Sequence, residues 1–307
     1  MDSPAALRAP PLDVSVIGYL RSVVDQRLRQ LLPSTKSQAD QLNRAMHHAL
    51  LAPGKRIRPI LTILASWELK VDGLLALDAG CALEMVHAAS LILDDLPSMD
   101  NASLRRGQPT THLTFGEDVA ILASIGLLTR AFGVLGAQLQ YSPVVRSSLV
   151  GILSHAVGAN GLVSGQYRDL REARSAGDIA AVLQANHEKT GMLFLASVEM
   201  AAEIADVRDE RLAQLQVFAS NLGQAFQILD DLLDGEASVS EIGKDTGQDG
   251  AKATVVSILG RVEAQKRLKR HLSDAADNVL TTGEPVGPLQ GFLQGMFGDY
   301  LFRLECA

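Results

Sequence analysis

The sequence contains few aromatic residues, few cysteines and no excess of basic residues. Aromatic residues make up 4% of its 307 residues and apolar residues 47%, and abundant Ala and Leu favour helices over sheets. The net charge of −7 argues against non-specific nucleic-acid binding but permits a phosphate ligand held by metal ions and a few cations. Only Cys81 and Cys306 are present, neither in a metal-binding spacing, so we expect a reducing, cytoplasmic environment.

Several motifs of known chemistry are also missing. The sequence has no P-loop, no glycine-rich dinucleotide motif after a strand and no G-x-S-x-G elbow. Residues 1–12 show no basic-then-apolar signal pattern. The most apolar run, residues 119–137, contains Arg130 and the polar residues Ser124 and Thr129. We therefore interpret it as a buried central helix and expect no membrane span.

Apolar residues recur at helical spacing along most of the chain, without convincing strand alternation and without a linker that would divide it. We predict an all-α fold with a flexible arm over residues 1–12 and a single domain over 13–307. Residues 235–251, rich in Gly, Asp and Ser, predict a mobile loop or lid. The expected helices cover residues 13–32, 37–51, 60–69, 72–95, 119–139, 143–156, 166–173, 178–204, 210–234, 255–280 with a break near Gly260, and 289–302.

Two acidic clusters point to a metal ion. Like charges this close in sequence repel each other unless a cation compensates them. Carboxylates without Cys or clustered His favour a hard ion, Mg²⁺ before Zn²⁺. The first cluster contains Asp94, Asp95 and, past a proline, Asp100; the second contains Asp230, Asp231 and Asp234.

Basic residues gather at four further places in the sequence. A lone basic pair is usually a solvated surface feature. In combination with two acidic clusters, however, Arg side chains that bind phosphate bidentately and Lys side chains that act as point charges fit a Mg²⁺–diphosphate site. The places are Lys55, Arg56 and Arg58; Arg105 and Arg106; Lys189; and Lys244 with Lys252 in the predicted lid.

Polar and small residues accompany these charges on predicted helices. His87 and Asp94 are seven residues apart and lie on nearly one helix face, where Ala89 and Ser90 leave space beneath the carboxylates. Ordinary helix packing explains such small residues equally well. Gln166 and Gln227 also lie near carboxylates in sequence, and a buried amide satisfied by the backbone is as good an interpretation of each alone.

Taken together, these residues resemble the trans-isoprenyl diphosphate synthase family. The motifs occur in the family's order over about residues 50–255, whereas the two ends of the chain resemble it only in helical character. The resemblance rests on Gly54-Lys55-Arg56-Ile57-Arg58-Pro59, Asp94-Asp95-x-x-x-x-Asp100, Arg105-Arg106-Gly107, Gly165-Gln166-x-x-Asp169, Lys189-Thr190-Gly191, Asp230-Asp231-x-x-Asp234 and Gly243-Lys244-Asp245.

This resemblance implies an all-α bundle around a deep central cavity, usually in a homodimer. It implies condensation of isopentenyl diphosphate with an allylic diphosphate, with three Mg²⁺ ions bound beside the diphosphate. The roles it assigns are as follows: Asp94, Asp100 and Asp230 as direct Mg²⁺ ligands; Asp95, Asp231 and Asp234 in water-mediated or outer positions; Arg105, Lys189 and Lys244 on the allylic diphosphate; Lys55, Arg58, His87 and Arg106 on isopentenyl diphosphate; and Thr190, Gln166 and Gln227 facing the developing carbocation.

The resemblance also bears on product length. In this family the residue five before the first aspartate often forms the pocket floor; here it is Ala89, followed by Ser90, and the two-residue insertion in the first motif is present. This pattern is similar to bacterial geranylgeranyl diphosphate synthases of carotenoid pathways, so we expect a C20 product. The residues also leave open a farnesyl or longer-chain synthase, a non-catalytic regulatory subunit and a class I terpene cyclase.

Overall fold

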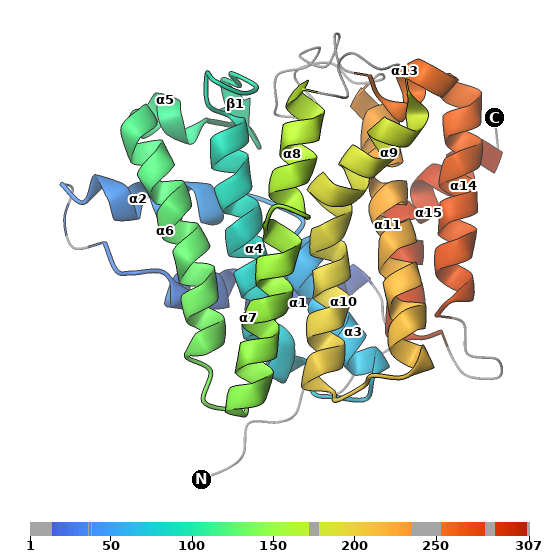
Figure 1. The fold of residues 1–307 in the computed structure, drawn as a ribbon, viewed down its shortest axis with the longest axis horizontal. Coiled ribbons are helices and arrows are strands. Elements are labelled where there is room, and N and C mark those ends of the chain that lie inside the picture. Colours follow the sequence, from blue (N-terminus) through green and yellow to red (C-terminus); the bar gives the residue numbers. More distant parts are fainter. Residues whose placement is uncertain are drawn as a thin grey trace.

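Helices form almost all of the regular structure in the computed structural model, which describes residues 14–35, 37, 39–171, 178–234, 253–279 and 286–305 (Figure 1). The elements are α1 (Val14–Leu31), α2 (Gln41–Leu50), α3 (Ile57–Glu68), α4 (Gly73–Asp94), β1 (Leu104–Arg105), β2 (Gln108–Pro109), α5 (Thr111–Phe115), α6 (Glu117–Gly136), α7 (Pro143–Val157), α8 (Leu162–Arg171), α9 (Ile179–Asn186), the π-helical turn η1 (His187–Gly191), α10 (Met192–Ile204), α11 (Glu210–Asp234), α13 (Val255–Leu259), α14 (Arg261–Asp277) and α15 (Pro288–Glu305).

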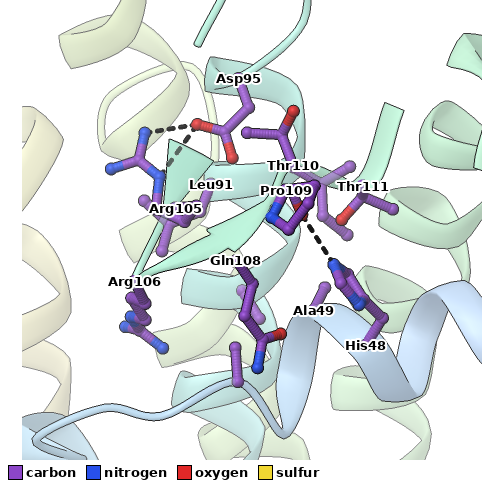
Figure 2. A pocket seen from close by; sticks show the side chains of 13 residues that line it. His48, Ala49, Leu91, Asp95, Arg105, Arg106, Gln108, Pro109, Thr110 and Thr111 are labelled. Carbon is purple, nitrogen blue, oxygen red and sulfur yellow. Dashed lines mark hydrogen bonds and ion pairs between the residues drawn. The ribbon is translucent and has the colours of Figure 1, made fainter. Parts of the chain in front are cut away.

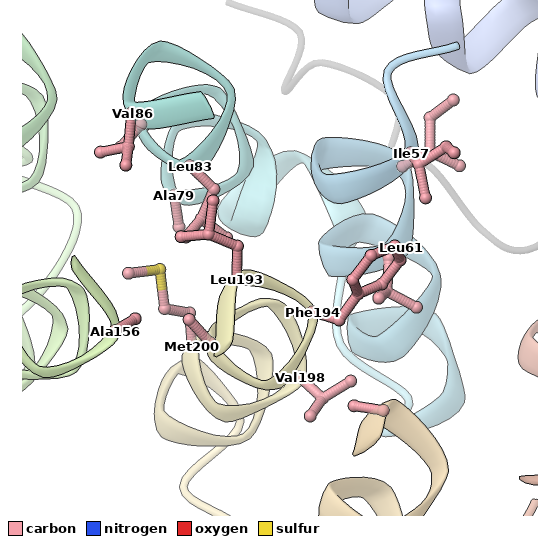
Figure 3. Packing of buried hydrophobic residues seen from close by; sticks show 14 of the residues in the cluster. Ile57, Leu61, Ala79, Leu83, Val86, Ala156, Leu193, Phe194, Val198 and Met200 are labelled. Atoms are coloured by element: carbon pink, nitrogen blue, oxygen red, sulfur yellow. The ribbon is translucent and has the colours of Figure 1, made fainter. Parts of the chain in front are cut away.

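Helix α4 is the central element of the fold. It is apolar nearly all round because it packs against α3, α6 and α10. Figure 3 shows Ala79 and Leu83 of α4 beside Leu193 of α10, while Phe194 of α10 turns towards Leu61 of α3. The 22 residues of α4 end at Asp94. The helix that packs the core therefore also delivers the first acidic cluster to one end of the bundle.

Helix α6 differs from the prediction of a buried central helix for residues 119–137. Two helices, α4 and α6, are long and apolar enough to cross a membrane, but 78% of the apolar window is buried in α4 and only 39% in α6. Leu122 and Ile125 of α6 are 54% and 52% exposed. The prediction was wrong because α6 packs on α2, α4, α5 and α7 while a second apolar face stays uncovered.

Two local features were not predicted. Residues 103–116, which lie between the helices expected over 72–95 and 119–139, contain a β-hairpin and the short helix α5. The hairpin's turn residues Arg106 and Gly107 both have positive φ, 54° and 76°, which is the conformation of a two-residue type I′ hairpin turn. The long helix expected over 178–204 is interrupted by η1, a π-helical turn of five residues.

The other helices agree with the prediction to within a few residues, although α3 begins three residues early, with Pro59 in its first turn, and α8 begins at Leu162. Almost all of the described buried apolar residues form one core cluster from α1 to α15. The predicted arm over residues 1–12 and lid over 235–251 lie outside the described residues. The division into an arm and one domain over 13–307 stays a prediction.

Candidate active site

One cavity of about 820 Å³ collects most of the predicted site residues, and its volume lies in the usual range for small-molecule sites. Its walls come from the loop before α3, from α3, α4, α8, η1 and α11, and from the hairpin. The predicted residues that line it are Lys55, Arg58, His87, Ser90, Asp94, Asp100, Arg105, Arg106, Gln166, Lys189, Thr190, Gln227, Asp230, Asp231 and Asp234.

The loop after α4 folds back so that the first acidic cluster is not a linear run. The backbone N–H of Asp100 donates to the carbonyl of Asp94 at 2.9 Å, and that of Ala102 to the carbonyl of Asp95 at 3.2 Å. Asp94 and Asp100 both reach the cavity. Burial raises the pKa of Asp94 to about 6, opposed by Lys189 and assisted by Asp100. A cation bound in the cavity would favour the ionised form of Asp94.

Asp95 lies apart from the cavity. Its carboxylate accepts two hydrogen bonds from Arg105, one from Nε at 2.9 Å, and it lines a separate pocket of about 30 Å³ behind the hairpin (Figure 2). Burial raises the pKa of Asp95, while the hydrogen bond from Arg105 lowers it. Asp95 therefore fixes the guanidinium of Arg105, which itself lines the cavity.

The second acidic cluster occupies the last turns of α11, which lines the same cavity as the end of α4. The hydroxyl of Thr190 donates to Gln227 Oε1 at 3.1 Å, and Gln227 Nε2 donates to Asp231 at 3.0 Å. A hydrogen-bonded path therefore joins η1 to this cluster, and it includes both Thr190 and Gln227, which were predicted to face the reacting carbons.

The turn η1 depends on glycines from two neighbouring helices. A Cβ on Gly165 of α8 would lie 2.1 Å from the backbone N of Lys189, and one on Gly223 of α11 would lie 2.9 Å from the Cα of Gly191. The Lys189 ammonium is placed 2.7 Å from Asp169 of α8. Close backbone approach thus sets the position from which Lys189 and Thr190 enter the cavity.

A second group of lining residues is cationic. Arg58 is 7% exposed, stacks over the ring of Phe194 at 5.3 Å and has a buried Nε without a hydrogen-bond partner among the described residues. Burial lowers its pKa to about 10, Glu84 opposes this and Arg106 adds to it. Burial and the guanidinium of Arg58 also lower the pKa of His87 well below its usual value. An anion would relieve this concentration of positive charge.

Sequence reasoning assigned no role to two further lining residues, Arg56 and Glu84. Glu84 was detectable in principle, because Glu84, His87, Leu91 and Asp94 are spaced by three, four and three residues and so share one face of α4. Ala89, in contrast, is 4% exposed and is not part of the cavity lining. Its carbonyl accepts a hydrogen bond from Ser124 of α6 at 2.9 Å. Lys244 and Lys252 lie outside the described residues.

The oxygen donors of the cavity fit a hard divalent cation that takes its remaining ligands from a bound anion. Among the described residues, no three His, Cys, Asp or Glu side chains lie close enough to hold a metal ion by themselves. The cavity nevertheless presents carboxylates from the end of α4, the following loop and α11, together with cations that would bind phosphate oxygens. Oxygen-only ligands completed by phosphate and water are the usual coordination of Mg²⁺.

Comparison with known proteins agrees with this architecture. Residues 39–281 match the polyprenyl synthetase family model. The chain is 45% identical to geranylgeranyl diphosphate synthase of Pantoea ananas, covering 91% of each chain, and 46% identical to that of Pseudescherichia vulneris, covering 93% of this chain and 92% of the relative. A geranyltransferase of Helicobacter pylori, solved with magnesium and isoprenyl diphosphate, superposes with a TM-score of 0.81 at 28% identity over 96% of this chain and 99% of that one.

The helical fold and these matches define the class of the protein, an all-α isoprenyl synthase. The chain belongs to the polyprenyl synthetase family.

Proposed function

We propose that the protein is a geranylgeranyl diphosphate synthase, which condenses isopentenyl diphosphate with an allylic diphosphate and releases diphosphate, with Mg²⁺ as cofactor. The observation that carries the proposal is that residues of both acidic clusters and the separate cationic group line one cavity. Two bacterial relatives with this name and about 45% identity support the C20 product. Farnesyl diphosphate is the expected primer, with shorter allylic diphosphates as further substrates.

In this proposal the acidic and the cationic groups of lining residues hold two different diphosphates. Asp94, Asp100 and Asp230 would bind Mg²⁺ directly, with Asp231 and Asp234 in outer positions and three ions in all. Mg²⁺, when bound, neutralises the leaving diphosphate as its carbon–oxygen bond breaks. Lys189, Arg105 and Lys244 would grip the same diphosphate. Lys55, Arg58, His87 and Arg106 would hold isopentenyl diphosphate.

The remaining lining residues would act on the reacting carbons. Thr190, Gln166 and Gln227 present polar oxygens towards the allylic cation, which is delocalised and survives in a site that excludes water. The double bond of isopentenyl diphosphate, held nearby, attacks this cation, and the new cation then loses a proton to the released diphosphate. Asp95, which binds Arg105, would serve by orienting that guanidinium.

The decisive experiment incubates the purified protein with isopentenyl diphosphate, farnesyl diphosphate and Mg²⁺ and separates the products by chromatography. We expect geranylgeranyl diphosphate, and no product after chelation with EDTA. Geranyl diphosphate and dimethylallyl diphosphate, tested in parallel, report the primer range. A product that stops at C15 from these shorter primers would support a farnesyl synthase instead, and one longer than C20 a longer-chain synthase.

A regulatory subunit and a terpene cyclase would each behave differently in this assay. A non-catalytic regulatory subunit would give no prenyl product alone. A class I terpene cyclase would convert an allylic diphosphate to hydrocarbon without isopentenyl diphosphate, and it would not need the group around Lys55 and Arg58. The acidic residues at the cavity, together with this basic group, favour neither of them. The cytoplasmic location and the carotenoid pathway stay predictions.

We also propose that the protein is a homodimer built on α6. Ile121, Leu122 and Ile125 are 41%, 54% and 52% exposed and lie on one helix face. Leu113 is 59% exposed on α5, which packs on α6. An apolar face of this kind on a helix with a high mean hydropathy marks an interaction surface. A second copy presents the same face and can cover it symmetrically.

A further inference from the structure

Arg56 lies between two residues of the proposed isopentenyl diphosphate site, but its own guanidinium is engaged by the protein. It is 3% exposed and adopts left-handed backbone geometry, with φ of 52°, as the N-cap of α3. Its Nε donates to Asp25 of α1 at 2.7 Å, one terminal nitrogen donates to Glu84 of α4 at 3.0 Å and the other to the carbonyl of Ala52 at 2.8 Å. This side chain therefore ties the loop before α3 to two helices.

Glu84 is the negative charge around which the basic residues gather. It is 2% exposed and lines the cavity beside Arg58 and Arg106. Its charge raises the pKa of both of these arginines, against the lowering that burial causes. Without Glu84, the guanidinium groups of Arg56, Arg58 and Arg106 would share a largely buried space with His87, and among the described residues only Asp25, bound to Arg56, would be a carboxylate hydrogen-bonded to any of them.

The loop that carries Lys55 is fitted closely to these guanidinium groups. A Cβ at Gly54 would lie 2.8 Å from a terminal nitrogen of Arg106 and 3.2 Å from one of Arg56. The backbone of the loop thus approaches both arginines as closely as a residue without a side chain allows. A shift of Arg56 would move the loop, and with it Lys55 and the start of α3.

From these contacts we propose that Arg56, Asp25 and Glu84 form a clasp of positioning residues, which holds Lys55, Arg58 and Arg106 in the arrangement that binds the diphosphate of isopentenyl diphosphate. In this arrangement Arg56 itself does not contact substrate. The inference rests on the function proposed above and adds to it the residues that preorganise one of its two substrate sites.

Conservative variants separate this role from a general loss of stability. Arg56→Lys keeps the charge but loses the planar fork that binds Asp25 and Glu84 together. Asp25→Asn and Glu84→Gln remove one acceptor charge each. Asp78→Asn is the matched control, because Asp78 lies on the same helix α4, is 5% exposed and binds Arg27 at 2.6 Å, yet does not line the cavity.

For Arg56→Lys and Glu84→Gln we expect the KM for isopentenyl diphosphate to rise about tenfold, as the loss of a charged hydrogen bond would cause, while the KM for farnesyl diphosphate stays within about twofold. Asp25→Asn, at a more exposed position, should show a smaller rise in the same KM. The control variant Asp78→Asn should have a lower melting temperature than wild type but the same KM for each substrate. Equal rises in both KM values, or no rise in either, would overturn the clasp.

A binding measurement distinguishes failure of the clasp from failure of the proposed function. Inorganic pyrophosphate is titrated by calorimetry into each protein without Mg²⁺, so that binding reports the arginines and not the metal-dependent site. Wild type and control should bind it more tightly than Arg56→Lys. A wild type that binds pyrophosphate but makes no prenyl product would refute the proposed function alone, whereas an active wild type with unchanged binding in Arg56→Lys would refute the clasp alone. If Glu84→Gln does not fold, Arg56→Lys and Asp25→Asn decide the question.

Discussion

At the scale of single residues, cations that we propose to bind substrate are already paired with carboxylates. Lys189 lies 2.7 Å from Asp169, and Arg105 is held by Asp95. Such pairs restrict long, flexible side chains before the substrate arrives, so that less conformational entropy is lost on binding. The arrangement explains how a protein with a net charge of −7 presents an anion site: its cations are local and fixed.

Product length is a property that single substitutions test. Ser90 lines the cavity, whereas Ala89 is buried outside the lining and its carbonyl is bonded to Ser124 of α6. A tyrosine at Ser90 should fill space below the carboxylates and shift the product from C20 towards C15, as measured by chromatography of the products. Ala89→Tyr should shift it in the same direction, but less, because the core packed around this buried residue must yield first. Unchanged C20 output from both variants would place the floor of the pocket elsewhere.

The lowered pKa of His87 predicts that the stability of the protein depends on pH. Its pKa in the folded protein is well below the usual value because of burial and the nearby arginines. As the pH falls from 7.5 to 5, the unfolded chain takes up a proton that the folded chain refuses, so the free energy of unfolding decreases. Relative to His87→Asn, wild type should lose at most about 1.4 kcal/mol per pH unit. Urea titrations of both proteins across this range measure the difference, and parallel curves would contradict it.

At the scale of elements, helix positions could be predicted from the sequence and the interruptions could not. The apolar residues of α4 and α11 predict these helices well, because α4 is buried over most of its surface and α11 buries apolar side chains from Leu215 to Leu232. Strands of two residues are too short to show alternation, and the hairpin depends on the positive φ of Arg106 and Gly107. The π-helical turn depends on contacts with α8 and α11, which no local pattern in residues 187–191 records.

The packing of η1 gives a test at this scale. Gly165→Ala places a Cβ against the backbone of Lys189, where neither atom can rotate away, so we expect a loss of about 1–3 kcal/mol in the free energy of unfolding and a large loss of activity. Gly151→Ala on α7 is the matched control. Its Cβ meets nothing within 4 Å, and alanine there should stabilise the helix by about 0.5–1 kcal/mol. Thermal unfolding and product formation rates compare the two variants, and equal behaviour would refute the packing argument.

At the scale of the whole molecule, the sequence predicts which residues gather near the site better than it predicts which of them line the cavity and which bind each other. The family resemblance predicts one central cavity for Asp94, Asp230 and Lys189, and all three line the cavity described above. It could not show that Asp95 turns behind the hairpin or that Glu84 joins the basic group, since both depend on tertiary contacts. The exposed face of α6 was missed for a similar reason: a helix that a partner covers would have the composition of a buried one.

The proposed dimer can be tested at its apolar face on α6. Ile125→Asp combined with Leu122→Asp should convert dimers to monomers at micromolar concentration, because two charges per chain would be buried in an apolar interface. Light scattering coupled to size-exclusion chromatography measures the mass. Val217→Asp serves as the control, because Val217 is 44% exposed on α11. A wild type that is monomeric at the same concentration would contradict the proposal.

The π-helical turn η1 contains one residue more than an α-helical turn would, and this limits which deletions the chain can tolerate. Deleting one position from residues 187–191 would let α9 and α10 join as an uninterrupted α-helix with more regular backbone hydrogen bonds. Everything beyond the deletion would then turn by about 100° relative to what precedes it. Either Lys189 would leave the cavity or the core face of α10 would point to solvent. Shortening by a single codon here should therefore abolish function, although it would improve the local geometry.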